Sequence, residues 1–178
     1  VSLSGSRGVI RADHINELSA AIVRVQRILK RENPHLDRSI LIEKFIEGHE
    51  YAVEGVLCSG EFQCLAIFDK PDPLDGPYFE ETIYLTPPDI RNDLETDILK
   101  TVAIACRAIG LTHGPIHAEC RVNSKGVWVL EVAPRTIGGQ CGRLLELALG
   151  LSLEEVIMSN ALGHSACVEN DGQAAGVM

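Results

Sequence analysis

Two glutamates, Glu119 and Glu131, each stand in a strand-like apolar run, and they are the residues with the clearest chemical potential. The second run, VLEVAPRTIGG (129–139), continues through a proline to Arg135 and a pair of glycines. A carboxylate in a buried strand is costly unless it has a partner. Oxygen ligands are those that a hard divalent cation such as Mg²⁺ prefers, so a metal between the two acids would account for both.

A register argument brings these acids together. A three-residue loop over 124–126 would pair Asn123 with Val127 and give a hairpin with one polar and one apolar face. In that register Glu119 lies opposite Glu131, whereas a loop of two or four residues mixes charge into the core. Gly126 suits the left-handed position that closes such a loop.

Two facing carboxylates repel each other, which favours a metal between them. The alternative is that one of them pairs with Arg121 or Arg135 in an ordinary surface network. The strand pairing alone leaves both interpretations open.

Hydrophobic periodicity and turn signals predict the elements that must position these residues. Asp13 is a plausible N-cap of the first helix, and Ser59-Gly60 is a two-residue hairpin signal. The order of the elements predicts an α+β fold, mainly an antiparallel sheet with helices on one face. Helices are expected over 12–31, 90–110, 140–150 and 151–163, and strands over 8–12, 39–45, 50–58, 61–69, 114–122 and 127–133, with the start of another near 173–178.

The composition limits the classes of partner. The chain has 178 residues, 46% hydrophobic, which indicates a globular domain rather than a disordered one. Its formal net charge of −9 argues against nucleic acid, which needs a basic face. We expect no membrane span and no secretory leader, and we interpret the six cysteines as core residues of a cytoplasmic protein.

Four segments in the right order resemble the ATP-grasp superfamily of carboxylate–amine and carboxylate–thiol ligases. They are SGSRGVIRA (4–12), LIEKFIEGHEYAVEGV (41–56), HAEC (117–120) and VWVLEVAPR (127–135). The elements DKPDPLDGP and APRTIGG are similar to those of the bacterial L-amino-acid ligases. The resemblance implies an ATP-grasp fold that is incomplete at its N-terminal side.

The resemblance implies a nucleotide site in the second of these segments. Glu43 would close a strand, Lys44 and Ile46 would bind adenine through their main chain, and Glu50, seven positions after Glu43, would bind the ribose. Apolar walls and a main-chain donor and acceptor suit adenine. Taken alone, both acids are better interpreted as solvated strand ends, whereas together with the Glu119–Glu131 pair they favour a nucleotide site.

Other residues gain candidate roles from the same resemblance, with ATP and Mg²⁺ as cofactors and Glu119 and Glu131 as the metal ligands. Arg135 could clamp the γ-phosphate or an acyl phosphate, unless it pairs with the two acids. The main-chain amides of Gly138 and Gly139 could bind an anion at the next helix start, unless they form a plain turn. Lys70 could reach a substrate carboxylate, although a lysine in an exposed loop is commonly just solvated. His117 shares the site face, where a hydrogen bond to a neighbouring acid is the plainer role.

Two departures from the family pattern affect these expectations. Ala133 stands where the family usually has an asparagine ligand. A water could replace that ligand, or the site could hold a single metal or bind metal more weakly. No lysine-bearing strand of the kind that contacts the nucleotide phosphates precedes the first segment, so we interpret the chain as a fragment, inactive alone. Residues 1–46 would be the remainder of an N-terminal subdomain and hinge, and 47–178 the C-terminal subdomain.

The function expected from these residues is an ATP- and Mg²⁺-dependent carboxylate–amine ligase acting through an acyl phosphate on small-molecule substrates. The alternative is a non-catalytic fragment that binds a nucleotide or a partner weakly. The sequence leaves the oligomeric state open, a homodimer included.

Overall fold

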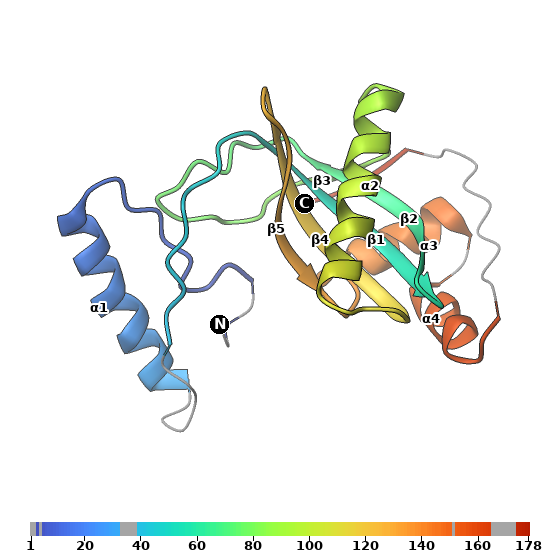
Figure 1. Cartoon of the computed structure of the whole chain (residues 1–178), viewed down its shortest axis with the longest axis horizontal. Helices are drawn as coiled ribbons and strands as arrows, with labels where there is room; N and C mark the ends of the chain where they lie inside the picture. The colour runs from blue at the N-terminus through green and yellow to red at the C-terminus, as the bar shows by residue number, and fades with distance from the viewer. Residues whose placement is uncertain (1–2, 4, 33–38, 151, 165–173) are drawn as a thin grey trace. The chain divides into compact units, whose positions relative to one another are not determined.

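The computed structural model describes residues 3, 5–32, 39–150, 152–164 and 174–178. The chain forms two compact units (Figure 1). The first comprises Val1–Glu47 and Pro73–Glu81, and the second comprises Gly48–Asp72 and Thr82–Met178.

The first unit contains one regular element among its described residues, helix α1 (Ile15–Glu32), which confirms the first expected helix. Leu29 of this helix is buried. The carboxylate of Asp13 accepts a hydrogen bond from Arg11 Nε at 2.9 Å, while its own N–H donates to Glu17 at 2.8 Å. Asp13 lies two residues before the first helical residue, Ile15, and its side chain binds Arg11.

Strands were expected over 8–12 and 39–45, and both expectations are wrong. The described residues there have no regular secondary structure, and the apolar side chains of Leu41 and Ile42 are exposed. A strand requires a neighbouring strand to complete its hydrogen bonds, and the described part of this unit contains none. An apolar, β-branched run is therefore insufficient by itself.

The second unit is built on a six-stranded sheet whose paired strands are antiparallel, in the order β5-β4-β1-β2-β3-β6. The α+β class and all the strands expected in this unit are confirmed, and β3 is an additional short strand that sequence patterning did not indicate. The strands are β1 (His49–Cys58), β2 (Glu61–Lys70), β3 (Tyr84–Thr86), β4 (Gly114–Asn123), β5 (Gly126–Ala133) and β6 (Ala175–Val177). The helices are α2 (Asn92–Ala108), α3 (Cys141–Leu149) and α4 (Leu153–Ala161).

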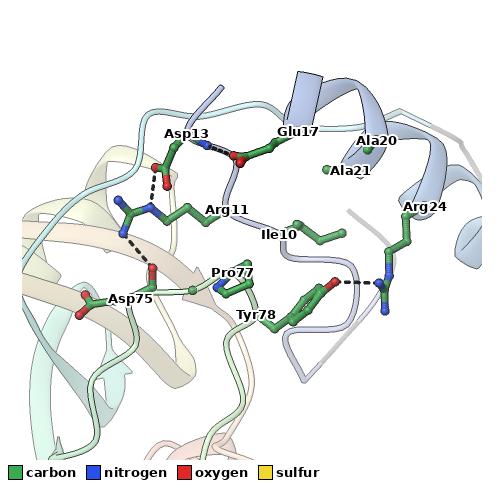
Figure 2. A pocket seen from close by; sticks show the side chains of 11 residues that line it. Ile10, Arg11, Asp13, Glu17, Ala20, Ala21, Arg24, Asp75, Pro77 and Tyr78 are labelled. Carbon is green, nitrogen blue, oxygen red and sulfur yellow. Dashed lines mark hydrogen bonds and ion pairs between the residues drawn. The ribbon is translucent and has the colours of Figure 1, made fainter. Parts of the chain in front are cut away.

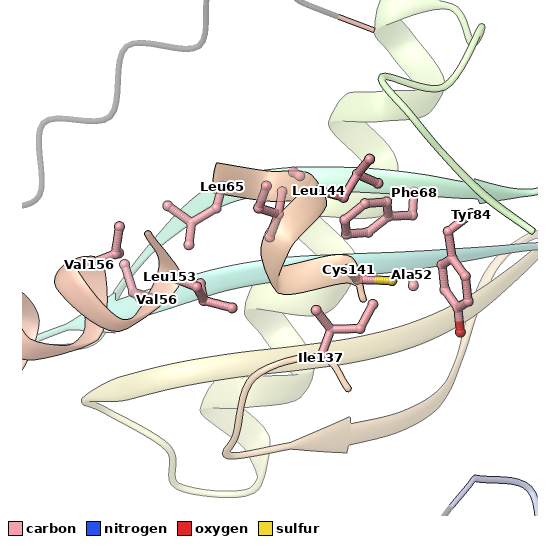
Figure 3. Close-up of a cluster of buried hydrophobic side chains, with 12 residues drawn as sticks. Ala52, Val56, Leu65, Phe68, Tyr84, Ile137, Cys141, Leu144, Leu153 and Val156 are labelled. Atoms are coloured by element: carbon pink, nitrogen blue, oxygen red, sulfur yellow. The ribbon is translucent and has the colours of Figure 1, made fainter. Parts of the chain in front are cut away.

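Helices cover both faces of this sheet rather than the one face expected (Figure 1). Successive strand residues point to opposite sides, so each strand can serve two cores. Val53 and Leu57 of β1 pack in one core with Ile98 of α2. Ala52 and Val56 of β1 pack in a second core, the α3–α4 core, which contains Leu145 and Val156 (Figure 3).

The β4–β5 hairpin places Glu119 opposite Glu131, as expected, but by a different route. Asn123 pairs with Gly126, so the loop is two residues long instead of three. A bulge beside Glu119 then makes Leu130 the extra residue on β5 and restores the predicted pairing of the acids. The Asn123 side chain accepts from the Lys125 N–H at 2.9 Å, which stabilises the shorter loop.

The other features of the unit agree with the sequence. Ser59 and Gly60 have φ angles of 52° and 89°, the positive values that a two-residue hairpin turn requires. The expected starts of a helix at 151 and of a strand at 173 lie outside the described residues.

Within the described part of the chain, none of the helices has the length and apolar character needed to cross a bilayer. Free thiols are found at Cys58, Cys64, Cys106, Cys120 and Cys141, while Cys167 lies outside the described residues.

Candidate functional site

One end of the sheet carries charged side chains on the face that also forms the α3–α4 core. The alternation of strand residues puts them there: the pairings Glu50–Arg121 and Glu54–His117 lie on the same face as Ala52. Buried charges are stable only when they are paired. We call this set the charged face, and its members are Glu50, Glu54, Lys70, His117, Glu119 and Arg121.

Lys70 joins two of the three acids. Its Nζ lies 2.8 Å from Oε1 of Glu50 and 2.7 Å from Oε1 of Glu119. Arg121 Nε donates to the other oxygen of Glu50 at 2.9 Å. Burial would lower the pKa of Lys70, but the charges of Glu119 and Glu50 outweigh it and raise the pKa, so the ammonium stays charged. The placement of Lys70 in an exposed loop is therefore wrong: it is the last residue of β2 and 3% exposed.

His117 joins the remaining acid to the same network, as its position on the site face suggested. Its Nδ1 lies 3.1 Å from Oε2 of Glu54, and its Nε2 lies 3.7 Å from Oε1 of Glu119. Burial would lower the pKa of His117, but hydrogen bonding and charge from Glu119 and Glu54 raise it to about 9. His117 is thus a cation at neutral pH, and the charged face holds three cations and three acids.

The acids respond to burial in different ways. Burial raises the pKa of Glu54, and the hydrogen bonds from His117 and the Ile137 N–H offset part of that rise. Burial would also raise the pKa of Glu119, but His117 and Lys70 outweigh it and hold the pKa at about 2. Glu119 is therefore ionised across the physiological range and can serve as a metal ligand.

Glu131 and Arg135 lie beside this network and are half exposed. Arg135 Nη2 is 3.4 Å from Oε1 of Glu131, and its Nη1 donates to the Thr136 carbonyl at 2.9 Å. The pairing of Arg135 with an acid, one of the two alternatives, thus occurs. An exposed pair of this kind contributes at most about 1 kcal/mol and leaves both groups able to exchange partners.

A family model described as the ATP-grasp domain matches residues 1–143. The chain belongs to the ATP-grasp family.

Named relatives of this ATP-grasp chain include a synthase and two ligases. It is 28% identical over 141 residues to dapdiamide A synthase of Enterobacter agglomerans, covering 77% of this chain and 32% of that protein. It is 24% identical over 174 residues to alanine–anticapsin ligase of Bacillus amyloliquefaciens, covering 88% and 36% respectively. The crystal structure of an L-amino acid ligase from Bacillus licheniformis superposes with a TM-score of 0.80 at 28% identity, over 94% of this chain and 43% of that one. The chain thus spans about a third of the length of these curated relatives.

The donor set of the ATP-grasp chain fits a magnesium ion that is shared with phosphate oxygens. Within the described residues, no group of three or more His, Cys, Asp or Glu side chains is arranged to hold a metal. Glu119 and Glu131 supply carboxylates from adjacent strands, and Ala133, opposite His117, supplies none. Magnesium is commonly held by one or two carboxylates, with waters and substrate phosphates completing its octahedron.

The two glycines lie where an anion could meet backbone amides. Gly138 and Gly139 precede α3, and Gly139 has a φ of +63°. The N-cap residue, Gln140, makes no side-chain hydrogen bond to the helix. The Gln140 side chain therefore does not cap α3, and the anion-binding role of the two glycines remains a prediction.

The expected adenine contacts remain predictions. Glu43 and Lys44 are exposed and Ile46 is half-buried, all within the irregular segment 39–47 of the first unit. Glu50 belongs to the second unit, where its two oxygens each accept from a cation, Lys70 or Arg121. A carboxylate oxygen can accept more than one hydrogen bond, so these contacts are compatible with the expected ribose role, which stays a prediction.

Sequence reasoning missed Glu54, and it considered Arg121 only as a possible partner of Glu119 or Glu131, whereas Arg121 pairs with Glu50. Each had a usable signal: Glu54 follows Glu50 by four strand residues, and Arg121 follows Glu119 by two, so each shares a face with a candidate site residue. Both side chains are almost fully buried, with exposed fractions of 1% and 3%.

The first unit contains a pocket of about 520 Å³, bounded by α1 and the segment 75–78 (Figure 2). Arg11 Nη1 donates to the Asp75 carbonyl at 2.8 Å, and Arg24 Nη1 donates to the Tyr78 hydroxyl at 2.7 Å. The two arginines of the walls thus already donate hydrogen bonds to neutral oxygens of the segment 75–78, and the expected site residues lie elsewhere.

The protonated His117 predicts a pH dependence of stability. Its folded-state pKa of about 9 exceeds the unfolded value of about 6.5, so its contribution is complete below pH 6.5 and is lost as the pH rises through 9. We expect the free energy of unfolding to fall by about 3 kcal/mol over this interval, measured by urea denaturation at several pH values. His117→Gln should lack this component, and cysteine titration in the unfolded chain would affect both proteins equally. Parallel curves for the two proteins would contradict the assignment.

Glu50 predicts a second stability effect. Glu50→Gln leaves Lys70 and Arg121 with one fewer negative partner in a buried site, so we expect a loss of about 3 kcal/mol, measured by urea unfolding at pH 7. Glu131→Gln, in a half-exposed pair, should change the stability by no more than about 0.5 kcal/mol. Equal stability of the two variants would show that Glu50 is not a structural partner of these cations.

Proposed function

We propose that the protein carrying this chain is an ATP- and Mg²⁺-dependent ligase that joins a small-molecule carboxylate to an amine through an acyl phosphate. The observation that carries the proposal is the cross-strand pair of Glu119 and Glu131 at the edge of the charged face. Membership of the ATP-grasp family supports it, as do relatives named dapdiamide A synthase, alanine–anticapsin ligase and L-amino acid ligase.

The proposed chemistry has two steps. A carboxylate oxygen of the first substrate attacks the γ-phosphorus, the bond to the β,γ-bridging oxygen breaks, and ADP leaves. The amine nitrogen of the second substrate then attacks the acyl carbon, inorganic phosphate leaves, and the nitrogen gives up a proton to form the amide. The protein contributes positioning and charge stabilisation, which dominate catalysis of phosphoryl transfer.

Four charged residues have tasks at the metal in this scheme. Glu119 and Glu131 would hold Mg²⁺, which when bound neutralises the charge of the phosphates. Lys70 and His117 keep Glu119 ionised and fix its position, so their support of the reaction runs through that carboxylate.

The segment after β5 would complete the phosphate site. Arg135 is half exposed and presents guanidinium donors beside Glu131, where they can bind phosphoryl oxygens in two-pronged fashion. Gly138 and Gly139 would add backbone amides at the start of α3. Glu43, Lys44 and Ile46 would bind adenine, and Glu50 the ribose.

The test is Glu131→Gln in the protein carrying this chain. We expect ATP-dependent amide formation to fall on the order of 100-fold, because glutamine keeps the shape of the side chain but removes the charge that holds the metal. ADP release with pairs of amino acids as substrates, together with Mg²⁺ affinity measured by calorimetry, gives both readouts.

Glu61→Gln, on the exposed end of the β1–β2 hairpin, is the matched control and should behave as the unmodified protein. Near-normal turnover and Mg²⁺ affinity in Glu131→Gln would make Glu131 a plain ion-pair partner of Arg135. A protein that releases no ADP with any carboxylate and amine, although it is folded and binds Mg²⁺, would refute the ligase proposal itself.

A further inference from the structure

Glu54 is a buried acid that was not among the site residues expected from the sequence. Its side chain is 1% exposed, and both of its oxygens are used. Oε2 faces His117 Nδ1 at 3.1 Å, and Oε1 accepts the backbone N–H of Ile137 at 2.9 Å. One carboxylate on β1 thus holds a side chain of β4 and the main chain of the segment that follows β5.

The contact with Ile137 lies in the middle of the candidate phosphate segment. Arg135 is two residues before Ile137, and Gly138 and Gly139 follow it directly. The Ile137 side chain is itself buried in the α3–α4 core beside Cys141, so the residue is anchored at both its main chain and its side chain (Figure 3). Movement of Glu54 would therefore release the segment at its centre.

The contact with His117 leads to the candidate metal ligand. With Nδ1 held by Glu54, the ring presents Nε2 toward Oε1 of Glu119 at 3.7 Å. The same carboxylate therefore orients the group that helps to keep Glu119 ionised.

An apolar residue at this position would avoid the cost of burying a carboxylate. Replacing buried ionic groups by well-packed apolar ones is often neutral or stabilising, so a buried pair is weak evidence of a stability role. The two oxygens of Glu54 contact His117 on β4 and the main chain of Ile137. Its presence is therefore better explained by a role in holding these two elements in place.

We infer that Glu54 is a positioning residue: it fixes the segment 134–139, with Arg135 and the two glycines, relative to the Glu119 carboxylate. This inference rests on the proposed function for the roles of the groups that Glu54 positions. The two contacts of Glu54 can be tested without measuring enzymatic turnover.

The experiment compares Glu54→Leu and Glu54→Gln in the full 178-residue chain, using amide hydrogen exchange and Mn²⁺ affinity. Leucine removes both contacts, so we expect exchange across 134–139 to rise about tenfold and Mn²⁺ affinity to fall about tenfold. Glutamine keeps an acceptor for the Ile137 N–H but removes the charge facing His117. It should keep exchange slow in that segment while still weakening Mn²⁺ binding.

Asn160→Leu is the matched control, because Asn160 is equally buried and its Nδ2 donates to the backbone carbonyl of Leu57, also on β1, at 3.0 Å. This variant should lose stability without faster exchange over 134–139 and without weaker Mn²⁺ binding.

Equal exchange over 134–139 in Glu54→Leu and Asn160→Leu would overturn the inference. If the leucine variant does not fold, the glutamine variant decides, since normal Mn²⁺ affinity there would also overturn it. Absence of Mn²⁺ binding by the unmodified chain would count against the proposed function, while exchange would still decide the role of Glu54.

Discussion

Lys70 lies between Glu50 and Glu119 inside the sheet, and the arrangement of the site depends on this one buried cation. Three strands contribute to the contact, one residue each from β1, β2 and β4. A buried ammonium is stable only when acidic groups surround it, because the cost of its desolvation otherwise exceeds its attraction to them. The two carboxylates satisfy this need, and the Lys70 charge in turn helps to lower the pKa of the largely buried Glu119.

This constraint explains why the remaining charges occupy their positions. Arg121 and His117 add two cations on β4, and Glu54 adds the third acid on β1, which makes the face electrically balanced. Glu119 lies at the edge of the face, opposite Glu131 on the next strand. Glu131 is half exposed and pairs with Arg135. In the proposed reaction, the ion pairs of Glu119 with Lys70 and His117 would hold this ligand in place while charge shifts.

Much of this arrangement follows from local sequence signals, and the rest from contacts between distant segments. Alternating residues and turn glycines predicted β1, β2, β4 and β5, because period and turn chemistry are encoded within a few residues. The pairing of Glu119 with Glu131 was predicted correctly although the loop is one residue shorter, since a bulge compensates, and bulges depend on packing that the pattern does not contain. The burial of Lys70 could not be inferred from its proline-rich surroundings, because its partners are 20 and 49 positions away. The absent strands at 8–12 and 39–45 show the same limit, since an apolar run specifies a strand only when another strand lies beside it.

The central claim is that Glu119 and Glu131 form the metal–nucleotide edge of the charged face, and the location of a paramagnetic ion tests it most directly. The measurement adds Mn²⁺ and a non-hydrolysable ATP analogue to the isotope-labelled chain and follows the line widths of its backbone amides by NMR. The account predicts that amides of 117–121 and 129–135 broaden first, and that excess Mg²⁺ restores them. Broadening centred on another part of the chain, such as the acidic segment 72–81, or no broadening at saturating Mn²⁺ and analogue, would contradict it.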